Sequence, residues 1–157
     1  MKRGKNMKTI AFDMDGTIAD LYGERGWLES LRNEDSSIFA KCDPLVDIEL
    51  FKATCHKLQN KGWTIGIITW LPKFASEVFE RECEETKKYW LKKHGLDFFQ
   101  FVSCQKYGTD KKQGLPFRGE YNILIDDNSE VRAEWNINDN YIAVDEKCII
   151  EKLQDLL

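Results

Sequence analysis

Four aspartates form two close pairs at distant points of the chain, and together they could hold a divalent cation. Asp13 and Asp15 lie in the segment Asp-Met-Asp-Gly-Thr, and Asp126 is followed directly by Asp127. Carboxylates gathered in one place repel one another unless some are protonated or a cation neutralises them. Carboxylate and carbonyl oxygens suit Mg²⁺, which keeps several waters. The expected ligands are Asp13, Asp127 and the main-chain carbonyl of Asp15, with Asp126 holding a metal-bound water.

An aspartate at such a site can attack a phosphoryl group that is fixed in line. Asp13 is the expected nucleophile. Asp15 would protonate the leaving oxygen and later deprotonate the attacking water. Gly16 permits the sharp turn that brings Asp15 over the site, and the loop amides from Gly16 to Thr17 add donors for the phosphate. These residues predict a two-step hydrolysis of a phosphate ester through an aspartyl-phosphate.

The phosphoryl oxygens also need a hydroxyl donor and a cation. Thr69 ends an apolar run and is the expected hydroxyl donor, while its neighbour Trp70 is a candidate substrate contact. Three lysines compete for the second role, namely Lys106, Lys111 and Lys112. Lys111 is preferred because it follows a Gly-Thr turn, and Lys106 comes second.

The elements that must position these residues alternate along the chain. Short apolar runs predict buried strands over residues 9–12, 64–69, 98–103, 122–125 and 141–144. Helical spacing predicts helices over residues 27–31, 48–58, 73–94, 130–135 and 147–157. This alternation predicts a three-layer α/β fold with a parallel five-stranded sheet, whose strand ends carry the site.

Two further features of this pattern concern the long helix and the polar stretch before it. The helix over residues 73–94 is predicted to have an apolar stripe of Phe74, Val78, Cys83, Trp90 and Leu91. Residues 18–46 are mixed and polar, and they predict a small cap inserted in a single domain that spans residues 1–157. In this insert, Tyr22, Arg25 and Trp27 could either grip a substrate or pack the insert onto the core.

Composition limits the choice of partners. The chain has 157 residues, 42% of them hydrophobic, and a net charge of -4. That charge gives no basic field for nucleic acid, so a small phosphorylated substrate would depend on local cations. The five cysteines form no Cys-x-x-Cys pair and are expected to be reduced. The basic start, Met1 to Lys8, leads into no signal-peptide core, and no apolar stretch is long enough for a membrane span, so a cytoplasmic protein is expected.

The order of these motifs resembles motifs I to IV of the haloacid dehalogenase (HAD) superfamily, over nearly the whole chain from Ile10 onward. Residues 13–20 are similar to the opening of the 5'(3')-deoxyribonucleotidases, and residues 88–92 to the helix before their third motif. Residues 107–111 and 126–135 resemble small phage and bacterial members.

The resemblance implies a HAD-like Rossmannoid fold with Mg²⁺ as cofactor. It implies that Asp13 is the nucleophile, Asp15 the acid and base, and Asp127 a metal ligand, with Thr69 and a lysine clamping the phosphate. It also implies a nucleoside monophosphate as the first candidate substrate.

Other functions use similar residues. A response-regulator receiver also combines an aspartyl-phosphate with a threonine and a lysine, but its acidic pair precedes the phosphorylated aspartate, which is the reverse of the order here. A phosphotransferase or mutase would pass the phosphoryl group to another alcohol, and a binding module could keep the fold without catalysis. These last two alternatives remain open at the level of sequence.

Overall fold

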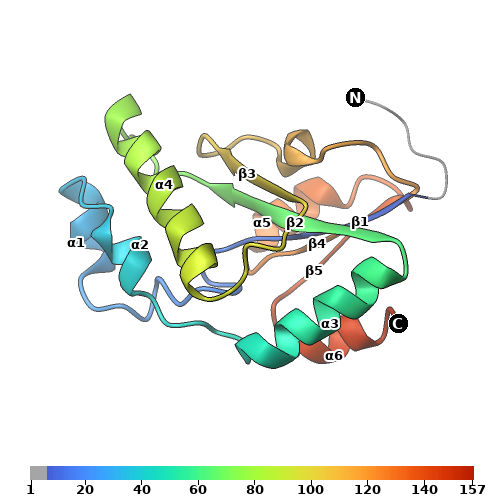
Figure 1. Ribbon diagram of the computed structural model, residues 1–157. Helices are drawn as coiled ribbons and strands as arrows, with labels where there is room; N and C mark the ends of the chain where they lie inside the picture. The colour runs from blue at the N-terminus through green and yellow to red at the C-terminus, as the bar shows by residue number, and fades with distance from the viewer. Residues whose placement is uncertain (1–6) are drawn as a thin grey trace.

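A computed structural model describes residues 7–157, which form an α/β fold around one sheet (Figure 1). All strand pairs are parallel, and the strand order is β3-β2-β1-β4-β5. The strands are β1 (Lys8–Phe12), β2 (Trp63–Trp70), β3 (Phe101–Gln105), β4 (Tyr121–Ile125) and β5 (Tyr141–Val144). The prediction of a five-stranded parallel sheet is confirmed.

Helices flank this sheet, as a Rossmann-like three-layer fold requires. They are α1 (Trp27–Arg32), α2 (Ser37–Lys41), α3 (Ile48–Asn60), α4 (Glu77–Lys93), the 3₁₀ helix η1 (Lys111–Gly114), α5 (Ser129–Trp135) and α6 (Ile149–Gln154). Side chains alternate along each strand, so Ile10 and Phe12 face the core formed with α3, α4 and α6. Ala11 faces the smaller core under α5. Both faces of the sheet are therefore covered.

The predicted strand over residues 98–103 is displaced, because its first two residues serve a different purpose. Phe98 and Phe99 pack against the main core from the connection before β3, and Phe99 lies beside Phe12 with ring centroids 6.2 Å apart. Gln100 then pairs with Ile65, accepting a hydrogen bond from its amide at 2.8 Å. The first part of this apolar run is therefore a half-buried loop, and the strand pairing begins only at Phe101.

The long helix also begins later than predicted, and its apolar stripe is different. The Ser76 hydroxyl caps α4 by accepting from the Phe79 amide at 3.2 Å. Phe74 precedes this cap, has a φ of 60° and is 93% exposed, and Val78 is exposed as well. Phe74 and Val78 were therefore wrongly assigned to the stripe. The buried face of α4 consists of Phe79, Cys83, Lys87, Trp90 and Leu91.

The insert between β1 and α3 carries α1 and α2, of which α2 was not predicted. It lies beside α4 in Figure 1, and α2 packs against that helix. The Trp90 indole donates to the Cys42 carbonyl at 2.8 Å, which is a buried contact between α4 and the insert. The Glu34 carboxylate accepts from both the amide and the hydroxyl of Ser76, each at 2.9 Å. The insert is thus tied to α4 at two points.

The C-terminal helix, the cysteines and the start of the chain were also subjects of prediction. The last helix is shorter than residues 147–157, because it starts after Cys148 and ends at Gln154. The five cysteines are unpaired, as predicted. Residues 1–6, with most of the basic start and the beginning of the predicted domain, lie outside the described residues. Within residues 7–157, no helix has the length and apolar character to cross a membrane.

Candidate functional site

The register of the two central strands brings the early and late aspartates together. Phe12 at the end of β1 pairs with Ile125 at the end of β4, so Asp13 and Asp126 leave the sheet at the same level. The Asp13 amide continues the ladder by donating to the Ile125 carbonyl at 2.9 Å. The carboxyl ends of neighbouring parallel strands therefore position the first aspartate of each pair.

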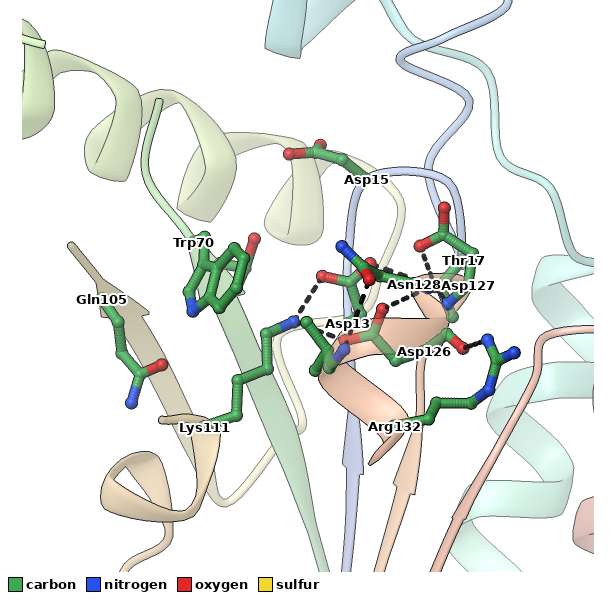
Figure 2. Close-up of polar contacts among 12 residues, drawn as sticks. Asp13, Asp15, Thr17, Trp70, Gln105, Lys111, Asp126, Asp127, Asn128 and Arg132 are labelled. Carbon is green, nitrogen blue, oxygen red and sulfur yellow. Dashed lines mark hydrogen bonds and ion pairs between the residues drawn. The ribbon is translucent and has the colours of Figure 1, made fainter. Parts of the chain in front are cut away.

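Three carboxylates form a cluster at this edge, shown in Figure 2. Asp13, Asp126 and Asp127 each offer one oxygen, and these oxygens all lie within 4.8 Å of one another. Asp13 and Asp126 are buried and Asp127 is half-buried. An acidic set of this kind can hold a hard divalent cation.

Lys111 lies against the cluster and neutralises part of its charge. Its ammonium donates to Asp13 Oδ1 at 2.8 Å and to Asp126 Oδ2 at 2.7 Å, and its side chain is only 3% exposed. Lys111 is the first residue of η1, which follows the predicted turn. Burial alone would lower the pKa of Lys111, but the two carboxylates outweigh this and raise it. The ammonium is therefore charged at neutral pH.

Thr17 and Gly16 shape the loop after Asp13. The Thr17 hydroxyl lies 3.1 Å from Asp13 Oδ2 and 3.2 Å from Asp127 Oδ1 and also accepts from the Asp127 amide. Gly16 has a φ of 84°, and a Cβ there would collide with the Asp127 carboxylate and approach Tyr22 to 2.7 Å. Both the conformation and the space require glycine at this position.

Asp126 accepts a hydrogen bond on each of its two carboxylate oxygens. Its Oδ2 accepts from Lys111, and its Oδ1 accepts from the Asn128 amide at 2.9 Å. Arg132 on α5 holds the Asp126 main-chain carbonyl at 2.9 Å (Figure 2). Asp126 thus organises the loop between β4 and α5, while Asp127 keeps more of its coordination capacity free.

The acidic groups resist ionisation in this environment. Burial, followed by repulsion from Asp13, raises the pKa of Asp126 to about 6. Burial and a hydrogen bond to Asp13 raise the pKa of Asp127 to about 8. Burial also raises the pKa of Asp15, in spite of a neighbouring ammonium. The cluster is therefore short of positive charge even with Lys111 beside it.

That neighbouring ammonium belongs to Lys87, which sequence reasoning missed. Lys87 is fully buried on α4, and its Nζ lies 2.7 Å from Asp15 Oδ2 and 2.8 Å from Thr69 Oγ1. It also donates to the Trp70 carbonyl at 3.3 Å. In Figure 2 the Asp15 side chain lies apart from the cluster around Asp13. Lys87 thus holds two of the predicted catalytic side chains, and a lysine on the apolar face of a helix was the signal that could have found it.

The competing lysines lie elsewhere. The Lys106 side chain is 74% exposed and pairs with Glu80 on α4 at 2.8 Å. Lys112 donates to the Glu134 carbonyl at 2.6 Å. Of the three candidates, Lys111 is the one that contacts the acidic cluster.

A cavity of about 770 Å³ opens over the site. Asp13, Asp15, Thr69, Lys111 and the late aspartates form its floor, and Trp70 lines one wall. Tyr22 and Trp27 of the insert also line it, whereas Arg25 is exposed and does not. Arg32 of α1 is the arginine of the insert that reaches the cavity. No protein-family model matches this sequence, and a search of curated proteins found no match.

Proposed function

We propose that the protein is a Mg²⁺-dependent phosphatase that hydrolyses a phosphate monoester through an aspartyl-phosphate on Asp13. The observation that carries the proposal is the cluster of Asp13, Asp126 and Asp127, whose oxygens lie within 4.8 Å of one another beside the Lys111 ammonium. A nucleophile, a cation and an acidic metal-binding set meet at the floor of one cavity. The resemblance to the HAD superfamily supports the same reading.

The donor set fits Mg²⁺, since it consists of carboxylate oxygens that carry excess negative charge. Asp13 and Asp127 would hold the ion directly, together with the main-chain carbonyl of Asp15. Asp126, whose oxygens are held by Lys111 and the Asn128 amide, would act through a metal-bound water. When bound, the ion would neutralise charge on the phosphoryl oxygens.

In the first step, an Asp13 carboxylate oxygen attacks phosphorus and the bond from phosphorus to the leaving oxygen breaks. Asp15 gives its proton to that oxygen, which departs as the alcohol. Lys111 stabilises the charge on the phosphoryl group. Because Lys87 donates to the Thr69 oxygen, the Thr69 hydroxyl proton is free to be donated to the phosphate.

In the second step, water attacks phosphorus while Asp15 accepts its proton. The bond between phosphorus and Asp13 breaks, which releases inorganic phosphate and restores both carboxyl groups to their first state. Lys87 is a positioning residue in this scheme, because it fixes the acid and base and the hydroxyl donor without touching substrate.

The substrate implied by the resemblance is a nucleoside monophosphate, and that stays a prediction. The same first step would serve a phosphotransferase if an alcohol replaced water in the second step. Measuring products with an added acceptor alcohol separates the two, because a phosphatase yields inorganic phosphate alone.

The test is phosphate release from a chromogenic ester, with and without MgCl₂, by the wild type and Asp13→Asn. Asp13→Asn removes the attacking charge with almost no change in volume, so turnover should disappear while the circular dichroism spectrum is kept. Asp139→Asn, in an exposed loop, is the matched control and should retain activity. Magnesium-dependent turnover by Asp13→Asn would refute the scheme, and no turnover by the wild type on any ester would favour a binding module.

A further inference from the structure

The cavity is far larger than a phosphate group, so most of it must hold the leaving group. Its volume of about 770 Å³ lies in the range of sites for whole small molecules, about 300–1,000 Å³. The reacting groups occupy only its floor. The walls above them therefore carry information about the alcohol part of the substrate.

One wall is a series of aromatic rings and cations that starts at the catalytic lysine. Lys111 Nζ lies 5.6 Å from the Trp70 ring, and the Trp70 and Tyr107 ring centroids are 4.8 Å apart. Lys73 Nζ then lies 5.6 Å from Tyr107 and 5.1 Å from Phe74. The Trp70 indole is fixed by donating to the Thr109 carbonyl at 2.8 Å. Aromatic side chains and ammonium groups thus follow one another from Lys111 to the exposed Phe74 (Figure 2 shows Trp70 beside Lys111).

The insert supplies a second aromatic wall. Tyr22 and Trp27 meet edge to face, with centroids 4.9 Å apart, and both line the cavity. Burial and the nearby carboxylates raise the pKa of Tyr22, so its phenol keeps its proton. The insert therefore adds two aromatic side chains to a cavity lining that already contains Trp70, Phe74 and Tyr107.

Polar partners for a sugar or polyol are scarce. Apart from the catalytic groups, the charged or amide side chains among the described residues of the lining are Arg32, Glu34, Lys73 and Asn128. Both acceptors in this set are already engaged, because Glu34 accepts from Ser76 and Asn128 accepts from two amides of α5. A polyol would have to share these acceptors with the bonds already made, and each hydroxyl donor left without a partner would cost free energy.

Backbone strain gives independent support. Phe74 lines this cavity with a positive φ of 60°, whereas the positive φ of Glu34 belongs to the C-terminal cap of α1, where the Asp35 amide donates to the Ser30 carbonyl at 2.8 Å. Phe74 is also 93% exposed, so its ring gains little from packing within the protein. Strained residues persist where a ligand contact requires them, and ligand clamps are one such place.

We propose that the substrate is a phosphate monoester whose alcohol carries a flat unsaturated ring, held between the aromatic wall of Trp70, Tyr107 and Phe74 and that of Tyr22 and Trp27. This inference rests on the proposed phosphatase function and names the substrate class for the same cavity. Simple aryl-methyl phosphates and nucleoside monophosphates share this chemistry, and the experiment distinguishes them.

The first experiment compares benzyl phosphate, cyclohexylmethyl phosphate, glucose 6-phosphate and a set of nucleoside monophosphates as substrates of the wild type with MgCl₂. Benzyl and cyclohexylmethyl esters differ mainly in whether the ring is flat. We expect a KM for the benzyl ester about three- to tenfold lower than for the cyclohexylmethyl ester. A further drop in KM with nucleotides would identify the base as the ring, and no drop would favour a simple aryl group.

The second experiment uses Phe74 variants and benzylphosphonate, which cannot be hydrolysed. Phe74→Ala should raise KM for benzyl phosphate about three- to tenfold with kcat nearly unchanged, and should weaken benzylphosphonate binding in calorimetry equally. Phe74→Gly should do the same while raising Tm, because glycine tolerates the positive φ. Tyr89→Ala, an exposed aromatic on α4, is the control and should change neither value.

The outcomes separate this inference from the proposed function. Equal KM values for the flat and puckered esters, or Phe74 variants that bind benzylphosphonate as the wild type does, would overturn the ring inference while leaving the phosphatase intact. Tight binding of benzylphosphonate without turnover of any ester would support the ring site and overturn the phosphatase.

Discussion

Replacing Lys87 with methionine would remove a fully buried charge while keeping most of the side-chain length. Three oxygens would lose their ammonium donor, namely Asp15 Oδ2, Thr69 Oγ1 and the Trp70 carbonyl. The ion pair between Lys87 and Asp15 joins residues 72 positions apart in the sequence, so it also links α4 to the loop after β1. The variant therefore tests both stability and the arrangement of the site.

The expected cost follows from the burial of the pair. Removing one partner of a buried ion pair typically costs about 3–5 kcal/mol. The Asp15 side chain keeps 14% exposure, so water can reach its carboxylate, and we expect the lower end, about 3 kcal/mol. In a chain of this length 1 kcal/mol changes Tm by about 2–4 °C, which predicts a Tm lower by about 6–12 °C.

Urea unfolding followed by circular dichroism would measure this cost, and a double-mutant cycle with Asp15→Asn would assign it. The combined variant should lose less stability than the sum of the single changes, with a coupling energy of about 2 kcal/mol. Lys88→Met is the matched control, because Lys88 is an exposed neighbour on the same helix, and it should cost under about 0.5 kcal/mol. Additive single effects, or a Lys87→Met cost below about 1 kcal/mol, would refute the reasoning.

Three further predictions concern the acidic cluster and its loop. Asp126 and Asp127 have raised pKa values in the folded protein, so between about pH 4 and pH 8 the folded state binds more protons than the unfolded chain does. The free energy of unfolding of the metal-free protein should therefore fall as pH rises toward about 8. Mg²⁺ binds the ionised carboxylates, so MgCl₂ should raise Tm more near pH 8 than near pH 6. Equal shifts of Tm at the two pH values in differential scanning fluorimetry would contradict this. Gly16→Ala should lower stability by about 2 kcal/mol and kcat/KM by about 100-fold, whereas Gly62→Ala, with positive φ but open space, should cost only the backbone strain. Lys111→Met should lower kcat/KM by about 100- to 1,000-fold, and Lys106→Met should leave it within about twofold, so a comparable loss in the two variants would contradict the assignment.

The parts of the site that could be predicted are those set by local sequence and sheet topology. Asp13 and Asp126 each follow an apolar strand, and parallel strands deliver their ends to one edge. Lys111 was preferred over Lys106 because it follows a turn, and the structure places Lys111 against the acidic cluster. These expectations needed only the strand assignment and the order of the motifs.

Lys87 could not be predicted with the same means, because its partners are fixed by the fold. The predicted helix starts at residue 73, which puts Phe74 and Val78 on its apolar stripe. Lys87 lies four residues after Cys83 and three before Trp90, so it falls on the part of the stripe that the sequence does predict. A lysine on that face demands a distant carboxylate, but the sequence does not say which one. Likewise, Phe98 and Phe99 have the composition of a strand and are placed outside the ladder by tertiary packing.

The hydrogen bond from Trp90 to the Cys42 carbonyl bears on how small this protein could be made. A version shortened to the sheet and its outer helices would uncover the Trp90 indole, an apolar area of about 200 Å². It would also remove Phe39, whose ring lies 4.7 Å from the Lys87 ammonium, and so admit bulk water to that charge. We expect such a truncated protein to aggregate through this exposed apolar area. We also expect water around Lys87 to weaken its ion pair with Asp15. The insert therefore covers part of the main core and shields the Lys87 ammonium from bulk water.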